Sequence, residues 1–183
     1  HHVEGHVRRF RNRTRGRFTC PMVIRMPYGG GIRALEHHSE APEATYAHLA
    51  GLKVVLPSTP RNARALLREA ILSPDPIVFL EPKAVYLAFR EEVPDEPETM
   101  PIGKGVVARS GKDVTLISYA AALRATLDAA EELADDYDID AEVLDLLSVA
   151  PIDNDLINES VRKTGRVVVV HESPKHCGVG AEV

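Results

Sequence analysis

The stretch LKVVLPSTPRNARALLREAILSPDPIVFL, residues 52–80, decides the fold class. It begins and ends with short apolar runs, 52–56 and 77–80, which are typical of parallel strands buried on both faces of a sheet. Between them, Thr59 is a suitable N-cap and Pro60 a suitable first residue for a helix. The stretch therefore predicts a strand–helix–strand unit of an α/β protein.

The predicted helix has apolar residues at helical spacing, which indicates one buried face. These residues are Ala63, Leu66, Leu67, Ala70 and Ile71. The sequence SPDP at 73–76 ends the helix, because proline cannot continue it.

The same alternation of strands and helices continues on both sides of this unit. Toward the amino terminus we expect a strand at 21–26, a glycine-rich loop at 27–36 and a short helix at 42–49. Toward the carboxyl terminus we expect strands at 114–119, 141–147 and 166–171, and helices at 121–134, 153–163 and from 178 onward. Asp153 is the expected cap of the second of these helices, and Gly165 its left-handed end.

Residues 82–112 interrupt this rhythm with the acidic, proline-rich run EEVPDEPETMP at 91–101. We interpret them as an interdomain linker, since prolines there oppose both helix and central strand. This gives a first α/β domain at 1–81 and a second at 113–183. The first lacks its beginning and the second its end, so we expect a piece of a longer protein.

Composition excludes several classes of protein. The chain has 183 residues, 44% of them hydrophobic and 27% charged, which suits a folded core and not general disorder. No apolar run approaches the length of a membrane span, so we expect no membrane partner. Cys20 and Cys177 are too few for a disulfide framework and fit a reducing compartment.

Basic residues gather near the amino terminus, with seven arginines and no acid between residues 8 and 25. An arginine-rich segment can bind nucleic acid, but this one lacks interleaved aromatic residues and a known DNA-binding motif. We therefore expect no nucleic-acid partner and favour an arginine-rich helix face at a subunit contact.

Ligands of open parallel sheets bind beyond the carboxyl ends of the strands. This rule selects the loop 27–40, the turn 73–76, Ser118 with Tyr119, Ser148, and His171 with Glu172. Of these segments, the loop 27–40 has the most residues suited to a functional site, because three glycines precede the run Glu36-His37-His38-Ser39-Glu40. Histidine suits proton transfer near neutral pH.

The same histidines also have simpler interpretations. His37 and His38 can belong to a solvated loop without chemistry, and two histidines with nearby acids make a weak zinc site. His48 is expected to pack or cap a helix, and His171 to be a satisfied core residue or a catalytic one. The sequence contains no nucleophile elbow, P-loop or GxGxxG pattern.

Four blocks of the sequence together resemble one known family. They are RGRFTCPMVIRMPYGGG (15–31), EHHSEAPEATYAHLAGLKVVLPSTP (36–60), PDPIVFLEPK (74–83) and KTGRVVVVHESPKHCGVGAEV (163–183). They are similar, in order and spacing, to the beta subunits of the thiamine-diphosphate-dependent 2-oxo acid dehydrogenases of the pyruvate and branched-chain types. The resemblance extends over essentially the whole chain.

The resemblance implies a fold and an activity. The fold is the C-terminal part of a three-layer, parallel-sheet pyrimidine-binding domain of transketolase type, followed by a truncated transketolase C-terminal domain. The activity is oxidative decarboxylation of a 2-oxo acid with transfer of the acyl group to lipoamide. Family members form an α2β2 heterotetramer that serves a lipoyl acyltransferase core, with thiamine diphosphate shared between subunits and Mg²⁺ held by alpha.

The resemblance also implies site residues. His38 matches the family's active-site histidine, which assists acylation of the lipoyl group, and His37 is its neighbour. The glutamate that protonates the cofactor's pyrimidine lies upstream of residue 1, so no cofactor-binding residue is assigned and the fragment alone is expected to be inactive. A structural potassium site is expected at Ala70, Ser73 and Asp75; alternatively, Asp75 simply ends a helix.

Several alternatives stay open at this stage. Other thiamine-diphosphate enzymes, of the transketolase, deoxyxylulose-phosphate synthase or acetoin dehydrogenase type, share the fold, as does a non-catalytic interaction module. Pyruvate and branched-chain 2-oxo acids are equally open as substrates. We expect a cytoplasmic protein of a prokaryote or archaeon, or a protein of the mitochondrial matrix if the source is eukaryotic.

Overall fold

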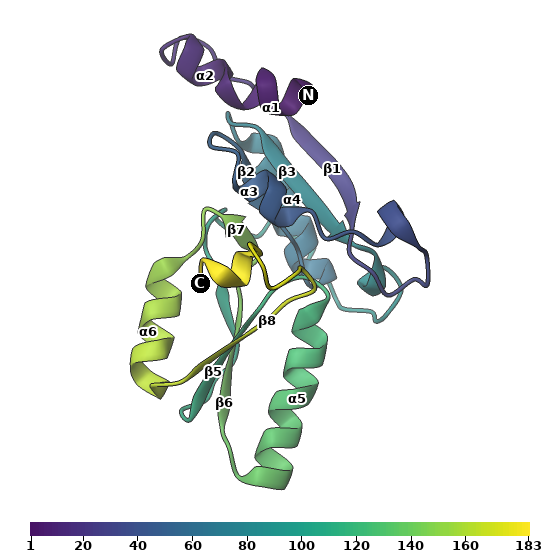
Figure 1. The fold of residues 1–183 in the computed structure, drawn as a ribbon, viewed down its shortest axis with the longest axis vertical. Helices are drawn as coiled ribbons and strands as arrows, with labels where there is room; N and C mark the ends of the chain where they lie inside the picture. The colour runs from purple at the N-terminus through teal and green to yellow at the C-terminus, as the bar shows by residue number, and fades with distance from the viewer.

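The computed structural model describes residues 1–36 and 38–183, and it consists of two α/β lobes (Figure 1). The sheet of the first lobe has the strand order β1-β3-β2-β7, and that of the second has the order β4-β6-β5-β8. The strands are β1 (Val23–Tyr28), β2 (Lys53–Val55), β3 (Ile77–Pro82), β4 (Val106–Arg109), β5 (Val114–Ser118), β6 (Ala141–Asp145), β7 (Ser148–Ala150) and β8 (Val167–Val170).

Six α-helices and four short 3-10 helices connect these strands in the described part of the chain. The α-helices are α1 (His2–Gly5), α2 (Phe10–Arg13), α3 (Glu43–Ala47), α4 (Pro60–Leu72), α5 (Ala122–Tyr137) and α6 (Asn154–Thr164). The 3-10 helices are η1 (Val7–Arg9), η2 (Glu36–Ser39), η3 (Lys83–Val85) and η4 (Val179–Ala181). Together, these strands and helices confirm the α/β class predicted from the sequence. Among the described residues, no helix is long and apolar enough to cross a bilayer.

The first sheet combines strands from both halves of the chain. Strands β1, β3 and β2 are parallel, as their apolar sequences predicted, with Tyr28 beside Pro82 at the carboxyl end. Strand β7 adds an antiparallel edge next to β2, pairing Ala150 with Val54. The sequence analysis did not predict β7, which follows directly on β6 and crosses from the second lobe to the first.

The second sheet contains a strand that the sequence analysis also missed. Strands β5, β6 and β8 are parallel, whereas β4 pairs antiparallel with β6 at one edge. Strand β4 lies inside the segment 82–112, which we had interpreted entirely as linker. Its two exposed valines, Val106 and Val107, give too short a pattern to stand out beside the acidic, proline-rich run before it.

Helix α4 begins as the sequence predicts. The Thr59 hydroxyl accepts from the Asn62 N–H at 3.3 Å, and the Asn62 side chain accepts from the Thr59 N–H at 2.9 Å, which makes a capping box. The predicted buried face is only partly correct. Leu66 and Ala70 are buried, but Ile71 is 65% exposed, because the buried stripe follows Asn62, Leu66 and Ala70 at intervals of four residues.

The acidic run between the lobes is bound to helix α4. The Arg61 guanidinium forms an ion pair with Glu98, and the Arg64 guanidinium donates to the main-chain carbonyls of Pro94, Asp95 and Glu96. The run therefore has an ordered path along the first lobe, set by two arginines one helical turn apart.

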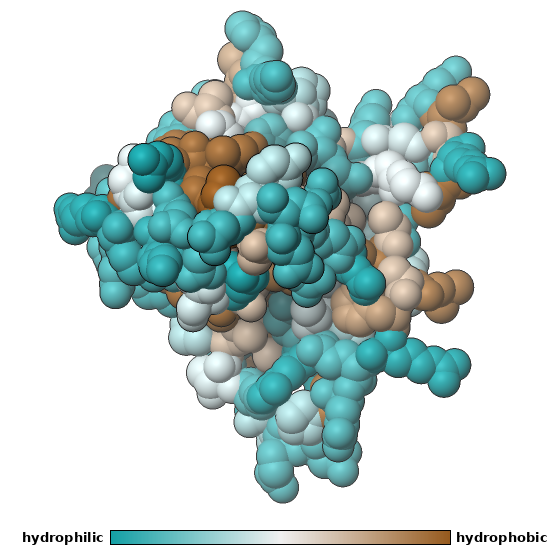
Figure 2. Space-filling model, turned by 90° about the horizontal axis from the view of Figure 1, so that it is seen from below, coloured by the Kyte–Doolittle hydropathy of each residue, from teal (hydrophilic) through white to brown (hydrophobic). Residues whose placement is uncertain are grey.

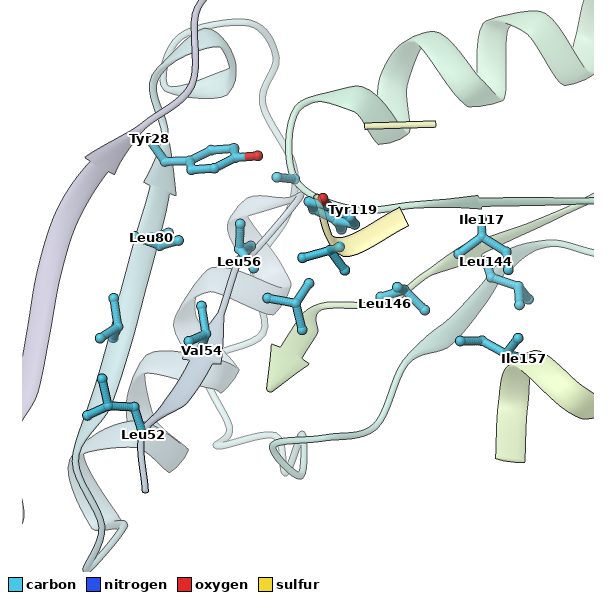
Figure 3. Packing of buried hydrophobic residues seen from close by; sticks show 14 residues of the cluster. Tyr28, Leu52, Val54, Leu56, Leu80, Ile117, Tyr119, Leu144, Leu146 and Ile157 are labelled. Atoms are coloured by element: carbon cyan, nitrogen blue, oxygen red, sulfur yellow. The ribbon is translucent and has the colours of Figure 1, made fainter. Parts of the chain in front are cut away.

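One hydrophobic core continues from the first sheet into the second (Figure 3). The side chains of Val54, Leu56, Val78 and Leu80 come from the first sheet, and those of Ile117, Leu144 and Leu146 come from the second sheet and the residues after it. Each of these seven side chains is fully buried. The two lobes are therefore packed together and are not independent units joined by a flexible linker.

A buried carboxylate lies where the two sheets meet. Glu43, on α3, is 0% exposed. Its Oε1 accepts hydrogen bonds from the Tyr28 hydroxyl at 3.1 Å and from the Tyr119 hydroxyl at 2.9 Å. Burial raises the pKa of both tyrosines, and the nearby Glu43 charge adds to the rise, so both hydroxyls stay protonated as donors.

A second buried carboxylate connects the lobes further along the interface. Asp145, at the end of β6, accepts a hydrogen bond from the Ser58 hydroxyl at 2.9 Å. Burial raises the pKa of Asp145 to about 7, although the bonds from Ser58 and the Leu147 N–H oppose the rise. This carboxyl consequently changes its charge close to neutral pH.

Replacing Glu43 tests the bond between the lobes. In Glu43→Leu the two tyrosine hydroxyls stay buried without an acceptor, so we expect a loss of about 3 kcal/mol in the free energy of unfolding. Glu43→Gln keeps an acceptor oxygen and should lose less than half as much. Urea unfolding measures both variants, with the exposed Glu159→Leu as control; equal stabilities for Glu43→Leu and this control would contradict the assignment.

Asp145 predicts a pH dependence of stability. Its folded pKa lies above its unfolded value, so the folded state retains a proton that the unfolded state releases, and stability should fall as the pH rises from about 4 to about 7. The difference between 3.8 and about 7 corresponds to roughly 4 kcal/mol at most. Urea unfolding at several pH values should show a flatter profile for Asp145→Asn, whereas the exposed Asp128→Asn should keep the wild-type slope.

Candidate functional site

The glycine-rich loop after β1 is closed on itself at residues 29–40. The Gly29 N–H donates to the Glu40 carbonyl at 2.9 Å, so the two ends of the loop lie side by side. Within it, the Ser39 hydroxyl donates to the Ala34 carbonyl. A loop of this length with adjacent ends is an Ω-loop, a type of surface loop that often carries functional residues.

Two of the three glycines in this loop are required by its backbone. Gly29 and Gly31 have φ angles of +75° and +86°, in the left-handed region that favours glycine. A Cβ at Gly29 would also lie 2.4 Å from Oε2 of Glu172, and one at Gly31 would lie 2.7 Å from Cβ of Ala84. At both glycines the backbone therefore lies close to other residues of the chain itself.

His38 lies on η2 near the end of this loop and is exposed. Its N–H donates to the Leu35 carbonyl at 3.3 Å, and its carbonyl accepts from the Lys83 ammonium at 2.5 Å. Lys83 follows β3, the neighbour of β1, and so approaches the loop from the same edge of the sheet. The other histidine of the predicted pair, His37, lies outside the described residues.

Glu172 reaches the same loop from the second lobe. It follows β8, and Oε2 of its carboxylate lies so close to the loop that a Cβ at Gly29 would be 2.4 Å from it. Burial raises the pKa of Glu172, an effect to which the Glu43 charge adds and which the Gly30 N–H and Lys83 oppose. The carboxyl ends of both sheets therefore meet at the loop that carries His38.

A hollow of 680 Å³ opens beside this loop. Its lining residues are Gly30, Ser39, Glu40, Ala41, Pro42, Thr45, Glu172 and Pro174. None of them is a lysine or an arginine, so this lining does not suit a diphosphate, which requires cationic side chains or a metal ion. It can receive uncharged groups and hydrogen-bond donors.

Other residues selected by the carboxyl-end rule, Tyr119, His171 and Ser148, make contacts within the fold. Tyr119 is buried, and its hydroxyl donates to Oε1 of Glu43. Its ring stacks on the His171 ring, with the two ring centroids 6.0 Å apart. His171 is half-buried, its Nε2 faces Gly180, and its buried Nδ1 has no hydrogen-bond partner among the described residues, so it is not the satisfied core histidine expected from the sequence. The Ser148 hydroxyl lies 2.8 Å from the Pro151 carbonyl and 3.2 Å from the Val54 carbonyl.

The turn 73–76 was placed at the wrong edge of the sheet by that rule. It immediately precedes β3, so it lies at the amino end of the parallel strands, opposite the loop 29–40. His48, by contrast, is the C-cap residue of α3, consistent with the capping role expected from the sequence.

The predicted potassium ligands lie in this turn, and their arrangement does not favour a cation. Oδ1 of Asp75 accepts from the Arg11 guanidinium at 2.7 Å, and Oδ2 lies 3.4 Å from the Lys53 ammonium. The Ala70 carbonyl accepts from the Ser73 N–H. Two cationic groups already neutralise the carboxylate, so the site at Ala70, Ser73 and Asp75 stays a prediction that these contacts do not support.

Two residues of the site were not selected from the sequence. Lys83 had a usable signal, since it comes directly after a buried strand whose carboxyl end adjoins the loop strand. Glu43 had none, because an acid in the first turn of a short helix is ordinarily a solvated residue. Only the packing of two sheets against α3 explains its burial.

Comparisons with known proteins agree with the fold. Residues 6–87 match the transketolase pyrimidine binding domain, and residues 103–183 match the transketolase C-terminal domain. A solved structure titled "Split gene transketolase, inactive beta4 tetramer" is similar with a TM-score of 0.74 and 28% identity, over 89% of this chain and 52% of that one.

Curated relatives are similar over nearly the whole chain. The pyruvate dehydrogenase E1 component subunit beta of Acholeplasma laidlawii is 49% identical over 97% of this chain and 54% of its own length. The subunit of the same name from Bacillus subtilis is 47% identical, over 99% and 55%. The 3-methyl-2-oxobutanoate dehydrogenase subunit beta of Mycobacterium tuberculosis is 46% identical, over 98% and 51%.

The chain spans about half the length of these relatives. Both transketolase-type domains, in the same order, and identities of 46–49% over 97–99% of the residues give the family assignment. The chain belongs to the family of the 2-oxo acid dehydrogenase beta subunits.

Proposed function

We propose that the chain is part of the beta subunit of the decarboxylating component of a 2-oxo acid dehydrogenase complex, with His38 as its catalytic residue. The supporting observation is the position of His38: exposed, on a closed loop, where the carboxyl ends of both sheets meet. The relatives are named for pyruvate and for 3-methyl-2-oxobutanoate, so the proposed substrate is pyruvate or a branched-chain 2-oxo acid.

The role proposed for His38 follows from its chemistry. An imidazole can hold or release a proton near neutral pH. When an acyl group passes to an oxidised lipoyl group, the lipoyl disulfide accepts the two electrons and breaks, one sulfur takes the acyl group, and the other sulfur needs a proton to leave as a thiol. Thiamine diphosphate, when bound, supplies the carbanion that decarboxylates the 2-oxo acid. The exposed loop leaves the imidazole accessible to a lipoyl group entering from outside.

The loop and the hollow beside it suit part of thiamine diphosphate but not its diphosphate group. The loop can border a bound cofactor and offers the His38 imidazole and main-chain groups. Since lysine and arginine are absent from the hollow's lining, the diphosphate and its Mg²⁺ are proposed to be held by an alpha subunit. The cofactor would then lie at the interface between the two chains, in an α2β2 heterotetramer.

Exposed apolar side chains near the loop support a protein partner there. Leu35 is 81% exposed and Ile32 47%, and across the contact with η3 Leu87 is 97% exposed and Tyr86 53%. Apolar side chains also gather in separate patches on the face seen in Figure 2. Clustered apolar residues beside a site are typical of subunit interfaces. We assign this cluster to the alpha subunit, and we propose a lipoyl acyltransferase core as the second partner.

The role of His38 predicts a split between two partial reactions. We use the full-length subunit assembled with its alpha partner and thiamine diphosphate. His38→Ala should lower acylation of a lipoyl domain by about 100-fold or more, because a proton-transfer group is lost. Decarboxylation, followed with an artificial electron acceptor, should fall much less. Both reactions are measured with pyruvate and with 3-methyl-2-oxobutanoate.

His48→Ala is the matched control, since it removes an exposed histidine at the end of α3 outside the loop. Equal losses in both partial reactions of His38→Ala, or no loss in either, would contradict the proposed role. Absence of any thiamine-dependent turnover in the wild-type assembly would instead favour a non-catalytic interaction module.

A further inference from the structure

The loop that carries His38 has almost no apolar anchoring. Between residues 29 and 40, the large apolar side chains Ile32 and Leu35 are both exposed, and the shared core begins again only with Ala41. Burial therefore contributes little to the orientation of the loop, and its polar contacts must fix it. The loop's own bonds, from Gly29 to Glu40 and from Ser39 to Ala34, close it but do not attach it to the body of the protein.

Two charged side chains make that attachment. Lys83 donates to the His38 carbonyl from η3, 45 residues further along the chain. The Glu172 carboxylate lies against the glycine end of the loop and fills the space that a side chain at residue 29 would need. One contact is at the histidine end of the loop, and the other is at its glycine end.

We propose that Lys83 and Glu172 are positioning residues that hold the loop, and with it the His38 imidazole, in the orientation used for acyl transfer. This inference rests on the proposed function for its catalytic part only. Lys83 belongs to the first lobe and Glu172 to the second, so the loop is aligned with both. Neither residue is assigned a contact with substrate.

The bond from Lys83 is suited to this role. Lys83 is half-buried, and a charged donor to a main-chain carbonyl forms a stronger bond than a neutral donor does. Because it contacts the carbonyl of residue 38 itself, its loss changes the backbone that carries the imidazole. Parallel pairing of β1 with β3 places η3 beside the loop, and Ala84 against Gly31 fills the remaining space.

Glu172 acts from the opposite side. Lys83 lowers the pKa of Glu172, against the larger effect of burial, which raises it. Removal of the Glu172 carboxylate opens a gap beside Gly29, so the glycine end gains conformational freedom.

Hydrogen–deuterium exchange of the full-length protein tests the positioning directly. In Lys83→Met, amides of peptides spanning 30–40 should exchange roughly tenfold faster, because one charge-assisted bond is lost. Lys83→Arg keeps a cationic donor and should restore most of the protection. Glu172→Ala should speed exchange at the glycine end, whereas Glu172→Gln keeps an acceptor and should change it less.

Lys112→Met is the matched control, since this exposed lysine lies in the turn before β5. Exchange in β5 and α5 reports whether a variant has lost stability as a whole. Faster exchange limited to residues 29–40 supports the proposal. Unchanged exchange there in both Lys83→Met and Glu172→Ala would overturn it, as would an equal increase in every segment.

Partial reactions of the assembled enzyme supply the functional arm. Lys83→Met should lower lipoyl acylation about tenfold more than decarboxylation, with recovery in Lys83→Arg. An equal loss in both reactions would contradict positioning of His38. If the wild-type assembly has no turnover, the proposed function fails, and the exchange experiment still decides whether Lys83 and Glu172 hold the loop.

Discussion

The arrangement of the two lobes depends on the Glu43 carboxylate, buried where their sheets meet. Its Oε1 accepts from Tyr28, at the carboxyl end of β1, and from Tyr119, just beyond the carboxyl end of β5. A buried carboxylate is costly unless donors satisfy it, and the two hydroxyls satisfy Oε1, whereas the buried Oε2 has no hydrogen-bond partner among the described residues. Through this contact the ends of two sheets with separate strand orders converge on one place, from which both the loop 29–40 and Glu172 extend.

Away from Glu43, the interface between the two lobes is made of other kinds of contact. Aliphatic side chains fill most of it, and Asp145 with Ser58 forms a second polar contact whose charge changes near neutral pH. Burial holds the lobes together, whereas directional bonds fix their alignment. The His38 loop follows the opposite pattern, since it is exposed and attached by charged side chains. Such a loop suits the role proposed for His38, in which the imidazole meets groups brought by other polypeptides.

Much of this fold could be predicted from local sequence. Continuous apolar runs marked the parallel strands, and Thr59, Asp153 and Gly165 marked helix ends, because capping is a short-range interaction. Strands β4 and β7 could not be found in this way. Each has only three or four residues and depends on hydrogen bonds with a strand distant in sequence. Strand β4 pairs with β6, and β7 pairs with β2.

In the candidate site, too, features local in sequence could be predicted, whereas contacts between residues distant in sequence could not. Glycines and a histidine on one loop are adjacent in sequence, so His38 could be singled out and then matched to a family. The contacts of Lys83 and Glu43 join residues 15 to 76 positions apart, and charge alone does not distinguish these two residues from surface residues. The carboxyl-end rule selected Glu172 but could not predict its contact with the loop. Asp75, the predicted potassium ligand, is paired with Arg11 and Lys53 from elsewhere in the chain, and these contacts could not be predicted from its local sequence.

The most direct measurement is an experimental structure of the full-length subunit assembled with its alpha partner and thiamine diphosphate. We expect the loop 29–40 to border the cofactor at the subunit interface, with the His38 imidazole directed toward the thiazolium ring. A loop that faces bulk solvent, with the cofactor bound elsewhere, would contradict the central claim that this histidine serves acyl transfer.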